Sequence, residues 1–185
     1  MPLTTMPENA TSAPTLHEIA TPDRRPYLFL ITVLVILLDR LSKIWIVHHI
    51  RPGYSISIIP GVFRLSHVLN TGAAFSMMEN WRADYVRIGL VSFSAVAAVL
   101  VFALLWRAGR TLSLTSVSLA LILGGALGNL YDRVVLHHVV DFLAVKIYHY
   151  NWPDFNVADS CIVIGACLLL LEIFQPDKAS NEQLL

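Results

Sequence analysis

Two aspartates lie at the edges of apolar stretches, where a carboxylate is costly. Asp141 follows the third apolar stretch of the chain, and Asp159 stands near the start of the fourth. A carboxylate inside a bilayer costs about 3 kcal/mol unless it is paired, hydrogen-bonded or protonated, so its presence indicates a function. Two carboxyl groups that adjacent helices bring together are what acid–base hydrolysis by a carboxylate pair requires. These two residues therefore predict a hydrolytic site.

The composition of the chain is typical of a membrane protein. Of its 185 residues, 56% are hydrophobic and only 14% are charged, and the mean hydropathy is +0.63. Soluble domains carry about a quarter charged residues. The net charge is zero, which gives no indication of a nucleic-acid partner. We expect Cys161 and Cys167, in the last apolar run, to be small buried hydrophobic residues rather than a disulfide or a zinc site.

Four apolar stretches predict an α-helical membrane protein with four transmembrane helices. Each stretch has roughly the 17 to 25 residues that cross a hydrocarbon core of about 30 Å. The expected spans are residues 27–47, 85–106, 112–131 and 157–174, within a membrane domain of residues 26–175. Residues 1–25 are expected to be a disordered tail, and residues 176–185 a second tail. A signal peptide is the alternative for the first span, although no small-residue cleavage site follows Val47.

Residues 51–76, between the first two spans, predict a small curved sheet on the membrane surface. Polar and apolar residues alternate from Tyr54 to Ile58, Pro60 and Gly61 mark a turn, and residues 62–68 continue as a second strand. A purely structural connector explains these strands equally well. The small residues of the following segment, 71–76, suit close approach by another chain.

Basic residues predict the orientation of the spans. The short connector between the second and third spans carries Arg107 and Arg110, and Arg24 and Arg25 precede the first span. Cytoplasmic loops are enriched in Lys and Arg, so both termini are expected in the cytoplasm. The opposite loops also hold basic residues, among them Arg51, which weakens the asymmetry. In this orientation Asp141 and Asp159 face the outer side of the membrane.

Two Asn-x-x-Asp pairs place an amide near a carboxylate. They are Asn129 with Asp132 and Asn156 with Asp159. Residues three apart share a helix face, so Asn156 is expected to donate a hydrogen bond to Asp159 or to orient a water beside it. Arg133 is the expected ion-pair partner of Asp132, whereas Asp141 has no Lys or Arg within four residues. This difference favours a structural role for Asp132 and a chemical role for Asp141.

Asp39 and Lys43 have the spacing of an ion pair within one helix. At about 1.5 Å per residue, Asp39 lies beyond the middle of the first span, in the half that leads to the strands. The pair either locks the helix into the bundle or lines the same polar pocket as the two aspartates.

Other kinds of site have less support. His137 and Asp141 are four residues apart, but the chain has no His-Glu-x-x-His motif and no Gly-x-Ser-x-Gly motif. The glycine-rich run 124–128 is better explained as small residues that let helices pack closely than as a phosphate cradle.

Together these residues resemble the lipoprotein signal peptidase family, also called signal peptidase II, over roughly Tyr27 to Phe174. The resemblance rests on five motifs in order: Asp39 with Lys43, residues 70–75 (Asn-Thr-Gly-Ala-Ala-Phe), residues 128–133 (Gly-Asn-Leu-Tyr-Asp-Arg), residues 139–142 (Val-Val-Asp-Phe) and residues 155–159 (Phe-Asn-Val-Ala-Asp). The long polar start of the chain departs from the family pattern but touches no motif.

The resemblance implies a four-helix bacterial inner-membrane aspartyl peptidase with a surface β-cradle over about residues 51–76 and a short surface helix. It implies that Asp141 and Asp159 are catalytic. The implied binding or supporting residues are Asp39, Lys43, Asn70, Gly72, Asn129, Asp132, Arg133, Asn156 and Ala158. Asp132 is the least certain assignment, because its motif alone also suits a catalytic residue.

The implied reaction is removal of the signal peptide from a prolipoprotein whose cysteine already carries diacylglycerol. The implied partners are these substrates and membrane lipids, and the protein is expected to be a monomer that needs no metal or organic cofactor. Two alternatives remain at this point. One is a small ion- or proton-coupled transporter, and the other is a membrane assembly factor in which the charges only lock helices together.

Overall fold

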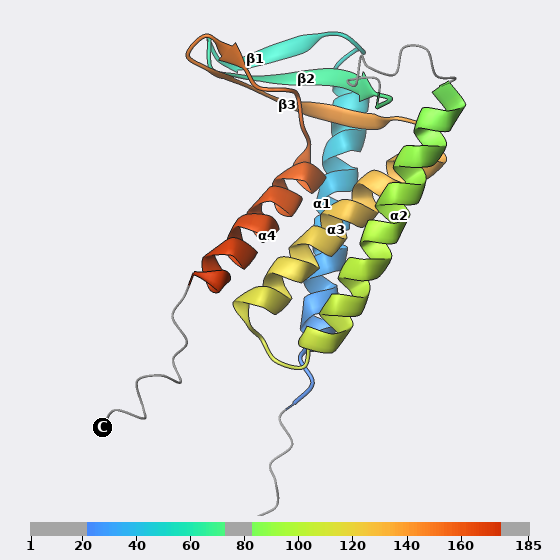
Figure 1. Cartoon of the computed structure of the whole chain (residues 1–185). Helices are drawn as coiled ribbons and strands as arrows, with labels where there is room; N and C mark the ends of the chain where they lie inside the picture. The colour runs from blue at the N-terminus through green and yellow to red at the C-terminus, as the bar shows by residue number, and fades with distance from the viewer. Residues whose placement is uncertain (1–21, 73–82, 175–185) are drawn as a thin grey trace, which may run out of the picture.

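The part of the chain that the structure describes forms four helices with a small sheet across one end of the bundle (Figure 1). The structure, a computed structural model, describes residues 22–72 and 83–174. The helices are α1 (Arg25–His49), α2 (Ala83–Ala108), α3 (Leu114–Val135) and α4 (Val157–Ile173). Each expected span corresponds to one helix, and the ends agree to within about one turn. The third helix runs past the expected end at residue 131, so Asp132 and Arg133 lie in its last turn.

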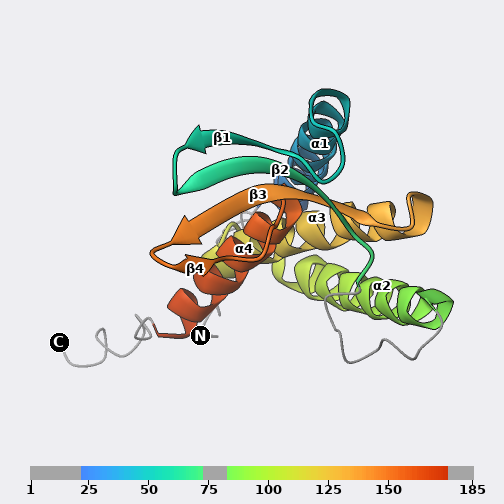
Figure 2. The ribbon, with the colours of Figure 1, turned by 90° about the horizontal axis from the view of Figure 1, so that it is seen from above.

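Helix α3 packs against the other three helices and lies among them when the bundle is seen from above (Figure 2). Its glycines make this possible. A Cβ on Gly124 would lie 2.7 Å from Cβ of Val35 in α1, and a Cβ on Gly125 would collide with the backbone oxygen of Ala158 in α4. Real side chains do not tolerate such distances, so this run is a close-packing surface, as its composition predicted.

Side chains cap the start of two helices. Ser113 accepts a hydrogen bond from the backbone N–H of Ser116, and the Ser116 side chain accepts one from Ser113 N–H, which fixes the start of α3. Asn156 and Asp159 make the same reciprocal pair at the start of α4. Pro26 lies in the first turn of α1, where its missing N–H costs nothing.

The sheet has four antiparallel strands in the order β1-β2-β3-β4. They are β1 (Ser55–Ile59), β2 (Phe63–Asn70), β3 (Val139–Ile147) and β4 (Tyr150–Asn151). The first two strands and the turn at Gly61, whose φ is 76°, lie where the alternating pattern predicted them. Strand β3 was not predicted. It lies beside β2 and carries Asp141, which therefore comes from the sheet and not from the end of a helix.

Two helices, over Asp84–Ala108 and Leu114–Val135, are long and apolar enough to cross a membrane. Helix α1 carries the charged residues Asp39, Arg40 and Lys43, and α4 has only 17 residues. The flanks of the bundle are nonetheless apolar and exposed, as at Phe93, which is 75% exposed. Cys167 is exposed on this apolar flank and Cys161 is half-buried; both are free thiols. The expectation that Cys167 is buried was wrong, because it faces outward from a thin bundle.

Some expected features lie outside the described residues. These are most of segment 71–76, residues 1–21 of the N-terminal tail and the C-terminal tail. The expected short surface helix is not found within residues 22–72 and 83–174, where the only helices are the four named above.

Candidate active site

A fully buried lysine joins α1 to α3. The Nζ atom of Lys43 lies 2.7 Å from Oδ2 of Asp39 and 2.7 Å from Oδ2 of Asp132. It also donates a hydrogen bond of 3.2 Å to Oδ1 of Asn129. Lys43, Asp39 and Asp132 are each only 1% exposed. The ion pair that the spacing of Asp39 and Lys43 predicted is therefore confirmed, and it extends to a second carboxylate on another helix.

Asp39 also ties α1 to α4. Its Oδ1 accepts a hydrogen bond of 3.0 Å from the backbone N–H of Ala158, the residue before Asp159. Gly128 of α3 leaves the room for this contact, because a Cβ there would lie 2.9 Å from Oδ2 of Asp39. One carboxylate on α1 thus connects the lysine to the first turn of α4.

The expected partner of Asp132 was wrong. Oδ1 of Asp132 lies 3.3 Å from Nη1 of Arg40, and its Oδ2 pairs with Lys43. Arg133 instead donates a 3.3 Å hydrogen bond to the backbone oxygen of Asn129. Neighbouring residues on a helix point about 100° apart, so Arg133 cannot reach the face that Asp132 presents to α1.

Arg40 is a site residue that the sequence reasoning missed. Its guanidinium lies over the ring of Tyr131, 4.9 Å from the ring centroid. It lines an apolar groove of about 610 Å³ between α1 and α3. Low polarity around the ion pair with Asp132 strengthens the attraction. No spacing within the first span pointed to this contact, because Asp132 is 92 residues away in the sequence.

Two asparagines connect the buried Lys43 by hydrogen bonds to the predicted catalytic aspartates. Asn129 accepts from Lys43 and donates through Nδ2 to Oδ1 of Asp159, at 2.7 Å. Asn156 is completely buried and donates through Nδ2 both to Oδ1 of Asn129, at 3.2 Å, and to Oδ1 of Asp141, at 2.7 Å. The lysine therefore fixes the Asn129 amide, and the two amides together orient both carboxylates.

The link between Asn156 and Asp159 differs from the expected one. Asn156 has an extended backbone and caps α4, so it is not on the helix face that the three-residue spacing assumed. Its backbone N–H donates to Oδ2 of Asp159 at 3.2 Å, and its side-chain oxygen accepts from Asp159 N–H at 3.0 Å. The side-chain amide remains available for Asp141 as a result.

Strand pairing supplies the remaining support for Asp141. Asn70, at the end of β2, donates through Nδ2 to Oδ2 of Asp141 at 2.9 Å. The Asn70 oxygen accepts the backbone N–H of Gly72 at 2.9 Å, and Gly72 has a φ of 84°, which suits glycine. Each carboxyl oxygen of Asp141 thus accepts a hydrogen bond from an asparagine amide.

Burial, with a smaller contribution from the nearby charge of Asp159, raises the pKa of Asp141 to about 6. Hydrogen bonds from Asn70 and Asn156 and the charge of Lys43 oppose this shift in the pKa. A carboxyl group whose pKa is raised in this way can carry a proton to a higher pH than an exposed aspartate can.

Nearly all of the predicted site residues belong to this one network. It contains Asp39, Lys43, Asn70, Gly72, Asn129, Asp132, Asp141, Asn156, Ala158 and Asp159, while Arg133 touches only its edge. Within residues 22–72 and 83–174, no three His, Cys, Asp or Glu side chains are placed to hold a metal ion.

The fold and the network define a membrane protein whose buried polar groups converge on two carboxyl groups. A sequence profile described as "Signal peptidase (SPase) II" matches residues 31–175. The chain belongs to this family and is therefore a protease.

Similar proteins agree with this membership. The chain is 43% identical over 155 residues to the lipoprotein signal peptidase of Ectopseudomonas mendocina, covering 83% of this chain and 90% of that one. It is 40% identical over 168 residues to that of Pseudomonas aeruginosa, covering 90% and 98%. A solved structure described as a bacterial membrane enzyme at 2.3 Å resolution has a TM-score of 0.72 and 26% identity, covering 84% of this chain and 92% of that one.

Replacing Lys43 tests the buried charge cluster. In Lys43→Met, Asp39 and Asp132 lose their shared cation, and breaking a buried ion pair costs about 3–5 kcal/mol. We expect a large fall in the melting temperature in detergent. Lys146→Met, at an exposed lysine, is the control and should melt like the wild type. Equal melting temperatures for all three proteins would contradict a stabilising role for Lys43.

Proposed function

We propose that the protein is an intramembrane aspartyl endopeptidase that removes the signal peptide from diacylglyceryl-modified prolipoproteins. The cut falls on the peptide bond before the lipidated cysteine. The observation that carries this proposal is that Asn156 contacts both aspartates. Its buried side-chain amide donates to Asp141, and its side-chain oxygen accepts from the backbone N–H of Asp159. Two carboxyl groups fixed by one residue are suited to act on a single water molecule.

The surroundings of the two carboxyl groups assign them different roles. Asp159 lies in the first turn of α4, where the helix dipole and two N–H donors stabilise a negative charge. Asp141 is 3% exposed, and burial raises its pKa to about 6. We therefore assign Asp159 as the general base and Asp141 as the general acid.

The proposed reaction uses only these groups and water. Ionised Asp159 takes a proton from water as the water oxygen attacks the scissile carbonyl carbon. Protonated Asp141 donates to the carbonyl oxygen and so stabilises the tetrahedral intermediate. The C–N bond then breaks as Asp159 gives its proton to the leaving nitrogen and the hydroxyl formed from the carbonyl oxygen returns its proton to Asp141, which restores both aspartates to their starting states. The products are a signal peptide with a new carboxylate and a lipidated cysteine with a free amine.

We propose that all four helices span the membrane, with both termini in the cytoplasm and the site near the outer face. The charges of α1 are compatible with a span, because Asp39 and Lys43 pair inside the bundle and Arg40 pairs with Asp132. Helix α4 is short because its polar start lies beneath the sheet (Figure 1). A bacterial inner membrane is the compartment that this substrate requires.

The network also favours a peptidase over the alternatives. A transporter would need charged groups along a path through the membrane, whereas the buried charged residues of the described helices, Asp39, Lys43 and Asp132, lie in the halves of α1 and α3 that lead to the sheet. The buried polar residues toward the other end, Thr32, Ser116 and Ser118, carry no charge. An assembly factor would use ion pairs only, and Asp141 and Asp159 lie in no ion pair within residues 22–72 and 83–174.

Replacing either proposed catalytic aspartate tests the pair directly. We expect Asp141→Asn and Asp159→Asn each to lower kcat for a diacylated precursor peptide at least about a hundredfold, the scale of lost acid–base catalysis. Mass spectrometry of the peptide before and after incubation measures cleavage, and the melting temperature checks folding. A folded variant of either kind that cleaves at near wild-type rate would rule out the assignment.

Asp132 should behave differently, because it pairs with Lys43 and Arg40 and contacts neither proposed catalytic carboxylate. We expect Asp132→Asn to lower the melting temperature while the folded fraction keeps kcat within about threefold, since a structural ion pair contributes to stability and not to the chemical step. Active-site titration with a tight inhibitor gives the folded fraction. A stable but inactive variant would instead place Asp132 in the catalytic set.

The pH dependence of cleavage tests the assignment of Asp141 as the acid. Because its pKa is about 6, Asp141 is protonated below that pH and ionised above it. We expect kcat/KM to fall by up to about tenfold per pH unit as the pH rises above 6. An unchanged kcat/KM from pH 5 to 8 would contradict the role of Asp141.

A stability measurement provides the control for this pH dependence. A carboxyl group whose pKa is raised by folding stabilises the folded state most at low pH, and this contribution is lost as the pH rises to about 6. The wild type should therefore lose stability relative to Asp141→Asn between about pH 4 and 6.

A further inference from the structure

The two hairpin turns at the free end of the sheet lie side by side, away from α1 and beyond α4 (Figures 1 and 2). The turn between β1 and β2 meets the end of β3, where the backbone N–H of Lys146 donates to the oxygen of Val62 at 2.7 Å. The turn between β3 and β4 contains Tyr148. No helix of the described residues covers this end.

Large apolar side chains are exposed around these turns. They are Ile59, Val62, Ile147, Tyr148, Tyr150 and Trp152, each at least half exposed. Tyr148 is 92% exposed and has a φ of 59°, an uncommon conformation for a bulky residue. Tyr and Trp concentrate where a membrane protein meets the headgroup layer. The turns therefore have the composition of a lipid-contacting tip.

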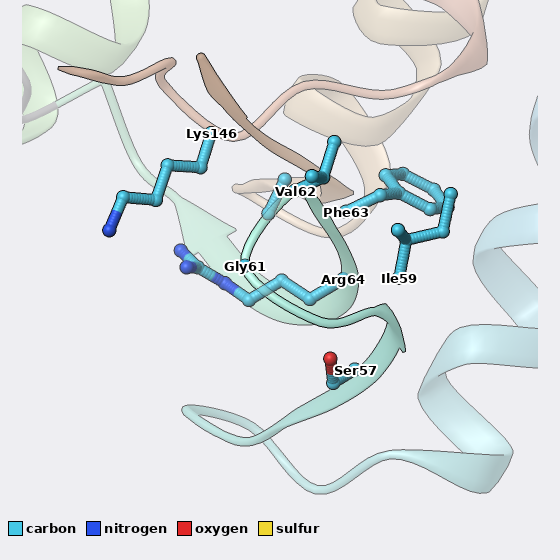
Figure 3. Close-up of a pocket in the computed structure, with 8 residues that line it drawn as sticks. Ser57, Ile59, Gly61, Val62, Phe63, Arg64 and Lys146 are labelled. Carbon is cyan, nitrogen blue, oxygen red and sulfur yellow. The ribbon is translucent and has the colours of Figure 1, made fainter. Parts of the chain in front are cut away.

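A small pocket that contains two basic residues, Arg64 and Lys146, lies next to this tip (Figure 3). It has a volume of about 100 Å³. Register places Ser57, Arg64 and Ala144 opposite one another on neighbouring strands, and Lys146 follows two residues later on the same face. The small Ala144 leaves space beside Arg64, and the cationic ends of Arg64 and Lys146 lie on the same side of the pocket (Figure 3).

The charges of the pocket favour an anion. Arg64 has one loose ion pair, of 3.6 Å, with Asp154, whose other oxygen accepts a hydrogen bond from Ser66. Lys146 has no ion pair within the part of the chain that the structure describes. Two cations and one carboxylate leave a net positive charge. A guanidinium fork beside an ammonium suits the several oxygens of a phosphate group.

We propose that this end of the sheet binds an anionic phospholipid of the surrounding membrane. The lipid phosphate lies between Arg64 and Lys146, and its acyl chains run along Ile59, Val62 and Tyr148. A lipid is the occupant because the cationic pocket and the exposed apolar turns adjoin each other, as a headgroup and its chains do. The sheet faces the outer leaflet only if the orientation given under the proposed function holds, but the binding itself does not depend on that function.

Such binding would act on the candidate active site through β3. Lys146 and Asp141 are five residues apart on this strand, about 17 Å in an extended chain. A lipid held at one end of β3 fixes the height of the strand over the membrane. Asp141, which the amides of Asn70 and Asn156 hold, lies toward the other end of the same strand.

Native mass spectrometry of the whole protein in neutral detergent, titrated with dioleoyl phosphatidylglycerol, tests the proposal. The double variant Arg64→Gln/Lys146→Gln should bind this lipid on the order of tenfold more weakly than the wild type, since each basic residue contributes to anionic-lipid binding. Arg51→Gln removes one exposed positive charge outside the pocket and should bind as the wild type does. Arg64→Lys/Lys146→Arg changes the same two positions but keeps both positive charges, so it should keep most of the binding. This result would show that the loss in the Gln variant comes from the lost charges and not from misfolding.

Two further arms identify the source of the phosphate. Val62→Ser/Tyr148→Ser should weaken phosphatidylglycerol binding, and millimolar inorganic phosphate should not displace the lipid. Displacement by inorganic phosphate would show a plain anion site and overturn the lipid proposal. So would unchanged lipid binding in Arg64→Gln/Lys146→Gln, or an equal loss in Arg51→Gln. Because the readout is bound lipid, it is independent of whether the protein cleaves a precursor.

Discussion

The buried ammonium of Lys43 is the contact on which the rest of the site depends. A charge inside a membrane protein is tolerated only when partners replace its water, and Lys43 has two carboxylates and one amide within 3.2 Å. Each partner leads to another element. Asp132, on α3, also pairs with Arg40 of α1, and Asp39 accepts a hydrogen bond from the backbone of α4. Asn129 donates a hydrogen bond to Asp159. Helices α1, α3 and α4 are thus connected through the partners of one buried cation.

Close approach of the helices is the condition for this network. The short side chains of the network reach one another only because α3 packs closely against α1 and α4, and its glycines provide the space for this packing. The asparagines then do what a charged residue cannot, because an amide both donates and accepts. Asn129 accepts from the lysine on one side and donates to a carboxylate on the other. Lys43 is in this way connected to Asp159 through a neutral amide and forms no ion pair with it.

Much of the fold was predictable from the sequence, because apolar runs of membrane length and polar–apolar alternation are local signals. The helices, the first hairpin and the pairing of Asp39 with Lys43 are all of this kind. Strand β3 was missed because it is apolar on both faces near Asp141, so it shows no alternation. Arg40 with Asp132 and Asn156 with Asp141 were missed for another reason. These contacts join residues that only the tertiary fold brings together, and local spacing favoured Arg133 and Asp159 instead.

Asp141 and Asp159 are proposed to act together on one water molecule. The most direct measurement is a crystal structure of the protein bound to a lipidated precursor peptide whose scissile carbonyl is replaced by a hydroxyl-bearing tetrahedral carbon. Our account predicts that this hydroxyl lies within hydrogen-bond distance, about 2.6–3.2 Å, of one oxygen from each aspartate. A hydroxyl that contacts only one of them, or that lies against Asp132, would contradict it.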